Sequence, residues 1–357
     1  MTASPATTPV ILFVYRRPDL LTHTFERIRA ARPTQLLIIA DVPDDENGGA
    51  TDPQHRAALA IAGGVDWDCD VEWHIAEQHL GCSTRMRSGL DWAFTRVERA
   101  IIIEDDIVAD PSFFPWCTAM LEMYSGDQRV MSVNGRNELV AWPAAGGDHL
   151  LARRGSIWGW ATWRRAWQHR RARKDAPTST GNPLFDAHLG VLGLEVPDGL
   201  RLGWDIDWTL DIARTAGVSV VPPVNLVANI GFGGSATHTM AGDDLRGVLP
   251  VGSVPVHSSS ARVEELDDVY DHWSLLVELM ATYRQPAAAA RLARLSGRPG
   301  VPAIDDSLRH HLAPFADPDE SLRVLSHLRN HGAAGAQLAA LTAAMEQASR
   351  WNSERPA

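Results

Sequence analysis

The chain has 357 residues, of which 45% are hydrophobic and 22% are charged, and its formal net charge is −11. This acidic balance argues against nucleic acid as a partner, because proteins that bind nucleic acids need a basic surface that releases counterions from the phosphates. Three cysteines without a CxxC pair argue against a disulfide framework or a structural zinc site, and no run approaches the ~18 apolar residues of a transmembrane segment, so we expect a cytoplasmic protein.

The first part of the chain alternates between strand and helix patterns. The all-apolar run from Val10 to Tyr15 predicts a strand that is buried on both faces of a parallel sheet. Pro18 favours the start of a helix directly after it, and residues Leu36 to Ala40 predict a second buried strand that ends at Asp41. A polar loop that contains glycine and proline follows from Pro43 to Pro53.

Two further strands continue this pattern. Residues Val71 to Ile75 alternate between apolar and polar and predict a third strand, and apolar side chains from Ser83 onward fall at helical spacing. Residues Ala100 to Ile103 predict a fourth strand, which runs straight into Glu104. Strands that alternate with helices in this way indicate βαβ units, so we expect a doubly wound, mostly parallel α/β sheet.

The pattern changes beyond Val133. Residues 134–185 are rich in loop signals and tryptophan, and a helix over 202–216, a strand over 218–221 and a glycine-rich loop over 229–238 are predicted after them. From about residue 262 the signals are helical and alanine-rich. We therefore expect an α/β domain over residues 1–260 and a helical C-terminal region over 261–357.

The strongest chemical signal is the acidic cluster of Glu104, Asp105 and Asp106. Three consecutive carboxylates at the end of a buried strand repel one another, and a divalent cation would relieve the repulsion. Ligands of open α/β sheets bind outside the carboxyl ends of the strands, which is where this cluster falls. The alternative is a solvated acidic turn, but the all-apolar strand before it favours a site for Mn²⁺ or Mg²⁺.

Several segments resemble, in chain order, those of one enzyme group. The acidic cluster resembles the DxD-type motif of GT-A glycosyltransferases, and Phe13 to Asp19 resembles the strand-to-helix opening of a glycosyltransferase-family-2-like group. The segments that resemble its nucleotide cleft and its later blocks are Leu80 to Arg85, Ser156 to Trp163, Trp204 to Trp208 and Asn229 to His238. The resemblance covers roughly residues 9 to 240 and implies a GT-A fold with a nucleotide-sugar donor.

The resemblance also implies roles for the matching residues. Asp106 would be the principal metal ligand, Glu104 would reach the donor ribose or a metal-bound water, and Asp105 would lie close by. The other donor-binding residues would be Val14, Tyr15, Arg16, Asp41, Gly81 and Arg85. Asp41 would accept a hydrogen bond from the base, with a turn or helix-capping aspartate as the alternative.

Arg85 would hold the diphosphate at the start of a helix, where both the guanidinium and the helix dipole favour an anion. The alternative is a surface arginine. The chain departs from the group's pattern at His79, where asparagine is expected, and at Val42 to Asp44, which replace Gly-Pro-Arg. Both departures affect the expected contacts with the donor.

The segment from Trp204 to Trp208 contains the expected catalytic base. Inverting transfer needs a carboxylate that takes the proton from the acceptor hydroxyl, and apolar surroundings raise the pKa of such a group. The resemblance makes Asp205 the first choice for this base and Asp207 the second. The alternative is a helix N-terminus with acidic residues and core tryptophans.

Two further features concern the metal and the acceptor. The resemblance implies that His238, after the glycine-rich loop, completes the metal site, although a lone histidine can also be structural. Trp158, Trp160 and Trp204 are the candidates for stacking on an acceptor sugar, while their spacing is equally typical of core packing. Gly159 suggests a turn that would present an indole to the acceptor.

The sequence thus predicts a metal-dependent, inverting glycosyltransferase. It would move a sugar from a nucleoside-diphosphate carrier, UDP first, to a glycan or small-molecule acceptor. The C-terminal region would serve acceptor binding or oligomerisation, for instance as a homodimer. The alternatives are a sugar-1-phosphate nucleotidyltransferase, which should carry a glycine-rich basic loop where Tyr15 to Pro18 stand, and a non-catalytic nucleotide-sugar or glycan-binding protein.

Overall fold

The computed structural model describes residues 6–139, 141–142, 149–169, 203–231, 249, 251–255, 261–267, 270–271 and 274. His238 and most of the predicted helical region over 261–357 lie outside the described residues. The domain boundary expected near residue 260 therefore stays a prediction.

The described part of the chain is built on one mixed sheet of eight strands. In spatial order these are β3 (Asp70–Ile75), β2 (Gln35–Ala40), β1 (Val10–Val14), β4 (Arg99–Glu104), β8 (Trp160–Trp163), β6 (Val130–Asn134), β9 (Val218–Val221) and β7 (Leu150–Ala152). Strands β3, β2, β1 and β4 are parallel, as are β6 and β9, whereas β8 and β7 run antiparallel to their neighbours. The expected mostly parallel α/β sheet is confirmed.

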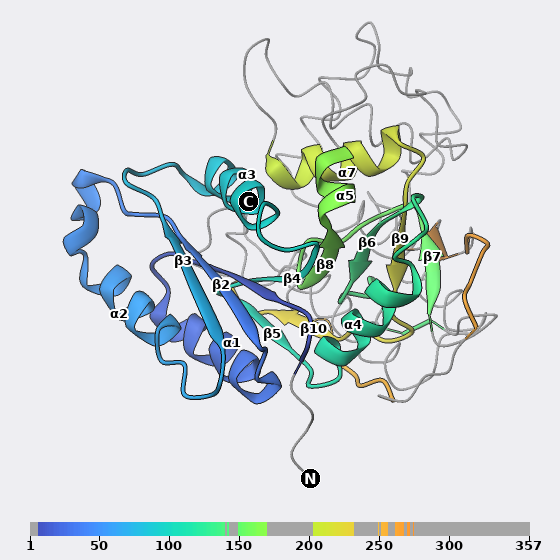
Figure 1. Cartoon of the computed structure of the whole chain (residues 1–357), viewed down its shortest axis with the longest axis horizontal. Helices are drawn as coiled ribbons and strands as arrows, with labels where there is room; N and C mark the ends of the chain where they lie inside the picture. Colours follow the sequence, from blue (N-terminus) through green and yellow to red (C-terminus); the bar gives the residue numbers. More distant parts are fainter. Residues whose placement is uncertain are drawn as a thin grey trace, which may run out of the picture.

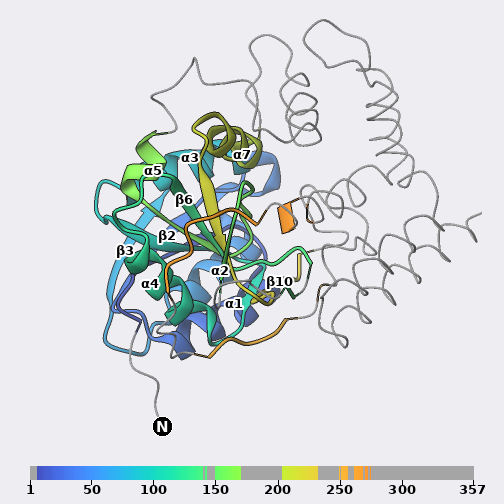
Figure 2. The ribbon, with the colours of Figure 1, turned by 90° about the vertical axis from the view of Figure 1, so that its right-hand side faces the viewer.

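Helices cover both faces of this sheet (Figures 1 and 2). On one face lie α1 (Pro18–Ala31), α2 (Pro53–Ala62) and α4 (Phe113–Met123), and on the other lie α3 (Cys82–Ala93), α5 (Arg164–His169) and α7 (Trp204–Arg214). A separate two-stranded ribbon pairs β5 (Ile107–Ala109) with β10 (Val227–Asn229). Two short 3-10 turns, Asp45–Asn47 and Gly49–Thr51, lie in the loop before α2.

The central strands form because their sequences are apolar throughout. Every residue of β1 is buried, and so are Ala100 to Ile103 in β4, as expected of strands covered on both faces. Pro18 occupies the first turn of α1, and Leu21, Phe25 and Ile28 form its buried face. These strands and this helix confirm the elements predicted from the sequence.

The region over 134–185 differs from the loop-rich expectation in its described part. It contains β7, α5 and β8, and β8 lies in the middle of the sheet between β4 and β6. Gly159 has φ +60° and makes the turn into β8, but Trp160 then points inward and is fully buried. The four residues of β8 are all buried, but the run Trp-Ala-Thr-Trp is short and contains a threonine, unlike the longer apolar runs that identified β1, β2 and β4.

Gly135 marks a tight junction between this sheet and the β5–β10 ribbon. A methyl group there would lie 2.6 Å from the Gly159 carbonyl oxygen and 2.5 Å from the Phe113 ring. We expect Gly135→Ala to lower the free energy of unfolding by about 1–3 kcal/mol, because the backbone of Gly159 cannot move aside as a side chain could. Chemical denaturation measures this, and Gly126→Ala is the matched control because nothing lies within 4 Å of its added methyl. Equal losses in both variants would contradict the prediction.

Candidate functional site

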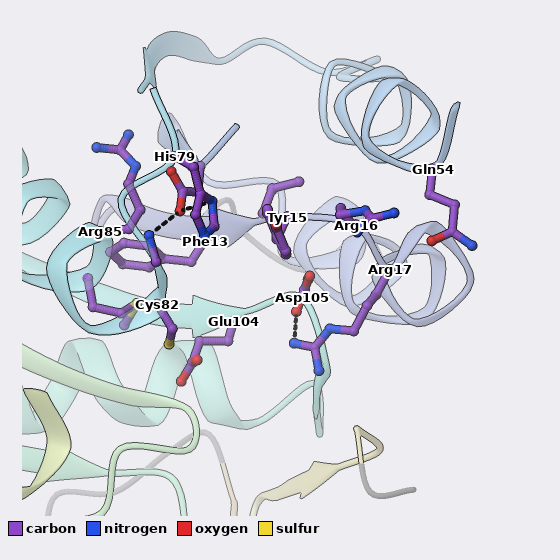
Figure 3. A pocket seen from close by; sticks show the side chains of 14 residues that line it. Phe13, Tyr15, Arg16, Arg17, Gln54, His79, Cys82, Arg85, Glu104 and Asp105 are labelled. Carbon is purple, nitrogen blue, oxygen red and sulfur yellow. Dashed lines mark hydrogen bonds and ion pairs between the residues drawn. The ribbon is translucent and has the colours of Figure 1, made fainter. Parts of the chain in front are cut away.

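A cavity of about 510 Å³ opens at the carboxyl ends of β1, β2 and β4 (Figure 3). It lies where the chain leaves β1 for α1 on one face of the sheet and enters α3 on the other. Its walls are formed by Phe13, Val14, Tyr15, Arg16, Arg17, Asp41, Gln54, His79, Gly81, Cys82, Arg85, Met86, Glu104 and Asp105. Most residues that the sequence assigned to the donor therefore line one cavity.

One wall of the cavity is aromatic. The rings of Tyr15 and His79 lie 5.9 Å apart at an angle of 34°, and Phe13 lies next to them (Figure 3). Nδ1 of His79 is 2.8 Å from the carbonyl oxygen of Val42, which fixes the ring. Burial raises the pKa of Tyr15, so its hydroxyl stays protonated. This wall offers flat surfaces of the kind on which a planar ligand packs.

Asp41 organises the loop that leads into α3. Its carboxylate accepts hydrogen bonds from the backbone amides of Val42, Leu80 and Gly81 at 2.9–3.3 Å. Nδ1 of His79 lies 3.3 Å from the same carboxylate. Both oxygens of Asp41 thus hold the backbone in place while the residue also lines the cavity, and the hydrogen bond that it would accept from a nucleobase stays a prediction.

Arg16 is held by a different part of the fold. Its guanidinium binds the carboxylate of Asp52 through two hydrogen bonds, the shorter of 2.9 Å. Asp52 caps the N-terminus of α2 by accepting a hydrogen bond from the amide of His55 at 2.7 Å. Arg16 thus borders the cavity but is tied to α2.

Arg85 is buried, not exposed on the surface. Nε donates to the carbonyl oxygen of Ala40 at 3.0 Å, and the terminal nitrogens contact His74 of β3. In Figure 3 the guanidinium points away from Glu104. Burial lowers the pKa of Arg85, and within the described residues no carboxylate forms an ion pair with it. Its charge therefore adds to the positive potential at the start of α3, at the edge of the cavity that it lines.

The acidic cluster has a partner that the sequence analysis did not assign. Arg17 binds Asp105 through Nη2 and Asp106 Oδ2 through Nη1, the latter at 2.8 Å (Figure 3 shows the contact with Asp105). The residue caps α1 directly after β1, and Phe13 of β1 pairs in register with Glu104 of β4. Because neighbouring parallel strands end at the same edge of a sheet, the residues that follow Phe13 and Glu104 come together. This adjacency is the sequence signal that could have predicted the pairing of Arg17 with the acidic cluster.

Arg17 does not balance all of the negative charge. Burial and the charges of Asp106 and Asp105 raise the pKa of Glu104 well above its usual range. Burial raises the pKa of Asp105 to about 6, against the opposing effect of Arg17. Asp105 is only 3% exposed, and its Oδ2 atom is buried without a hydrogen-bond partner. One guanidinium faces three carboxylates, and the excess negative charge lies on the cavity wall.

This charge distribution fits a divalent cation. Within the described residues, no group of three acidic, histidine or cysteine side chains is arranged around one point. Mg²⁺, however, is usually held by one or two carboxylates together with substrate phosphates, so a complete protein cage is not required. Asp106 and Glu104 are the carboxylates that would hold it, and His238 lies outside the described residues.

The start of the glycine-rich loop passes directly over Asp106. Asn229 pairs with Ile107 in the β5–β10 ribbon, and the amide of Ile230 donates to the Asp106 carbonyl at 2.9 Å. A methyl group at Gly231 would lie 2.2 Å from Asp106 Oδ2 and 2.9 Å from Arg17 Nη1. Only glycine leaves space for this ion pair, so the ribbon brings the segment before His238 to the acidic cluster.

The first turn of α7 presents Asp205 and Asp207. Asp207 forms an ion pair with Arg87 of α3, whose Nη1 also donates to Ser83 at 2.8 Å. Burial first of all, with a smaller effect from the charge of Asp205, raises the pKa of Glu104 well above its usual range. Asp207 joins two helices, and the assignment of Asp205 as the base stays a prediction.

The tryptophans differ in their surroundings. Trp160 is fully buried, and its ring lies 6.1 Å from Trp204 and 5.4 Å from Trp208. Trp204 is also buried, so stacking of Trp160 or Trp204 on an acceptor sugar is corrected to core packing, because no face is open. Trp158 is half-buried, with the guanidinium of Arg136 at 4.4 Å over its ring.

No protein-family model matches the chain, and no curated protein matches it. Among solved structures, it is similar to UDP-glucose pyrophosphorylase complexed with UDP-glucose, with 10% identity and a TM-score of 0.34 over 62% of this chain and 91% of that one. It is also similar to the inositol-1-phosphate CTP transferase from T. maritima, with 8% identity and a TM-score of 0.34 over 68% and 94% of the two chains. Similarities at this level concern the fold alone. Within the described residues, no helix is both long and apolar enough to cross a membrane.

The unbalanced charge predicts that the site costs stability. Folding raises the pKa of the Glu104 carboxyl, so this group destabilises the folded protein once the pH exceeds the pKa that the carboxyl has in the unfolded chain. Below that pKa the group is protonated in both states and the penalty is absent. We expect Glu104→Gln to raise the free energy of unfolding at about pH 7 in the presence of EDTA, and the gain to vanish near about pH 4. Chemical denaturation at both pH values measures this, with the exposed Glu77→Gln as control. A Glu104→Gln protein that is less stable than wild type at the higher pH would contradict the prediction.

Proposed function

We propose that the protein is a metal-dependent, inverting glycosyltransferase that uses a nucleoside-diphosphate sugar. The observation that supports this best is one cavity that has an aromatic wall at Tyr15 and His79 and carboxylates at Glu104 and Asp105. A nucleotide sugar has a planar base at one end and a charged diphosphate, which a metal on the carboxylates would hold, at the other. Asp205 in the first turn of α7 would be the base for the acceptor hydroxyl.

The donor would lie along the wall from Tyr15 to Glu104. The base would pack near Tyr15 and His79, whose rings are held 5.9 Å apart. The diphosphate would face the N-terminus of α3 at Cys82, where the helix dipole favours an anion. The buried charge of Arg85 strengthens that preference. UDP remains the first choice of nucleotide.

The reaction assigns separate tasks to the carboxylates. Asp205 takes the proton from the acceptor hydroxyl while the hydroxyl oxygen attacks the anomeric carbon of the donor. The nucleoside diphosphate leaves in the same step. Asp106 and Glu104 would hold a divalent cation, which would supply Lewis-acid stabilisation of the negative charge on the diphosphate. Asp207 holds the first turn of α7 against α3 through Arg87. The acceptor would be a glycan or a small molecule.

A sugar-1-phosphate nucleotidyltransferase is the alternative, and its chemistry is that of the proteins named among the similar structures. Such an enzyme needs a flexible basic loop after its first strand to hold a triphosphate. Here only Tyr15, Arg16 and Arg17 separate β1 from α1. Both arginines bind carboxylates of this chain, Arg16 at Asp52 and Arg17 at the acidic cluster. Because this connection is short and its arginines already bind carboxylates, it favours glycosyl transfer over nucleotidyl transfer.

Product analysis separates the two reactions and a non-catalytic binding protein. With Mn²⁺ and a panel of UDP-sugars, a glycosyltransferase releases UDP and free or transferred sugar, and EDTA stops the release. With added pyrophosphate, a nucleotidyltransferase instead forms UTP and a sugar 1-phosphate. We expect UDP from at least one donor and about 10²–10⁴-fold less of it from Asp106→Asn. UTP as the product would support the alternative, and donor binding without turnover would support a binding protein.

The two aspartates of α7 should differ in their effect on turnover. We expect Asp205→Asn to lower kcat by about 10²–10⁴-fold, because it removes the base, while donor binding stays near wild type. Asp207→Asn should have a much smaller effect on kcat and should lower stability, because it weakens the ion pair with Arg87. Steady-state kinetics and donor titration measure this. A larger kcat loss in Asp207→Asn than in Asp205→Asn would reverse the assignment.

A further inference from the structure

Arg17 occupies the position that a cation needs at the acidic cluster. Its two terminal nitrogens are divided between Asp105 and Asp106, so a single guanidinium bridges neighbouring carboxylates. The contact with Asp106 uses Oδ2, on the residue that would be the principal metal ligand. Gly231 covers the same atoms so closely that a methyl group would lie 2.2 Å from Asp106 Oδ2. A divalent ion that binds Asp106 through this oxygen would therefore compete with Arg17 for it.

The site keeps one unsatisfied carboxylate oxygen while Arg17 is bound. Asp105 is 3% exposed and its Oδ2 atom has no hydrogen-bond partner, although Arg17 contacts the other oxygen. A buried acceptor without a partner carries a desolvation cost that a second cation or a rearrangement would remove. Arg17 therefore neutralises only part of the negative charge of the cluster, and a divalent cation would neutralise more of it.

The backbone of Arg17 is held independently of its side chain. Its carbonyl oxygen accepts from the amide of Leu21 at 2.9 Å and starts α1, so the backbone is fixed by the helix. The side chain is 21% exposed, lines the cavity and has several rotatable bonds. Rotation would carry the guanidinium from the carboxylates into the cavity, where an anionic diphosphate would receive it.

We propose that Arg17 is an internal cation that competes with the divalent metal for Asp106 and is drawn away by the nucleotide. Metal and nucleotide would then bind cooperatively: the metal takes the carboxylate while the phosphates take the arginine. This inference rests on the proposed function, because it assumes a donor with a diphosphate. It assigns to Arg17 the control of metal affinity, which is separate from any role in the chemical step.

The test is Mn²⁺ binding without a sugar donor. Electron paramagnetic resonance counts free Mn²⁺ in titrations of wild type and of Arg17→Gln, first alone and then with saturating UDP. We expect Arg17→Gln to bind Mn²⁺ about tenfold more tightly than wild type in the absence of UDP, because the competing charge is gone. We also expect UDP to improve Mn²⁺ affinity less in Arg17→Gln than in wild type, because the arginine no longer has to be displaced.

The neighbouring arginine provides the matched control. Arg16→Gln makes the same change one residue earlier, on a guanidinium that binds Asp52 and not the cluster, so Mn²⁺ affinity should stay at the wild-type value. Arg17→Lys keeps the charge but places it on an ammonium that cannot bridge two carboxylates as a fork, so its affinity should lie between those of wild type and Arg17→Gln. This variant also keeps the comparison available if Arg17→Gln does not fold.

The outcomes separate this inference from the proposed function. Equal or weaker Mn²⁺ binding by Arg17→Gln and Arg17→Lys, relative to wild type, would overturn the role of Arg17 and leave metal-dependent turnover of UDP-sugars untouched. An equal increase in Mn²⁺ affinity in Arg16→Gln would also overturn it, since the increase would then come from the loss of any nearby positive charge and not from Arg17 itself. Absence of Mn²⁺ binding in every variant would show that there is no cation site to compete for.

Discussion

The ion pair between Arg17 and the carboxylates of Asp105 and Asp106 joins the elements on which the cavity depends. It connects the start of α1 to the end of β4 and lies directly beneath Gly231, where the β5–β10 ribbon ends. The parallel pairing of β1 with β4 makes the contact unavoidable, because Phe13 and Glu104 are in register and the residues after them share one edge. A buried pair of this kind is weak evidence for stability, since desolvation offsets much of its attraction. Its persistence next to an unsatisfied carboxylate oxygen is better explained by a site that is completed by a ligand.

The sequence predicted those parts of the fold that local patterns determine. The all-apolar strands β1, β2 and β4 and the helices α1, α3 and α7 have recognisable periodicities, and their observed bounds lie within a few residues of the predicted ones. Strand β8 could not be found in this way, because its four residues include a threonine and form too short an apolar run, and its place between β4 and β6 is set by tertiary pairing. The same limit explains why core packing of Trp160 and Trp204 could not be separated from an acceptor platform: both need the same residue types.

The candidate site was predictable in its position but not in its partners. Strand ends identified the acidic cluster, Tyr15 and Asp41, since each follows an apolar run. The ion pairs of Arg16 with Asp52 and of Arg87 with Asp207 join residues far apart in sequence, and nothing local predicts them. The backbone contacts of Asp41 have the same origin, because its carboxylate accepts from amides of a loop about forty residues further along, at Leu80 and Gly81. The cavity is therefore shaped mainly by contacts between helices, strands and loops that lie far apart in the sequence.

The position of Asp205 follows from aromatic packing. Trp160 of β8 lies against Trp204 and Trp208 of α7, and Trp208 also lies 5.5 Å from Trp167 of α5. The Trp167 indole donates to Asp91 of α3 at 2.8 Å, so the same cluster reaches the helix that borders the cavity. The ion pair of Arg87 with Asp207 joins α3 and α7 a second time. With α7 held at both points, Asp205 lies in the first turn of a helix whose position is fixed. The tryptophans thus contribute to the proposed chemistry through the helix that they hold.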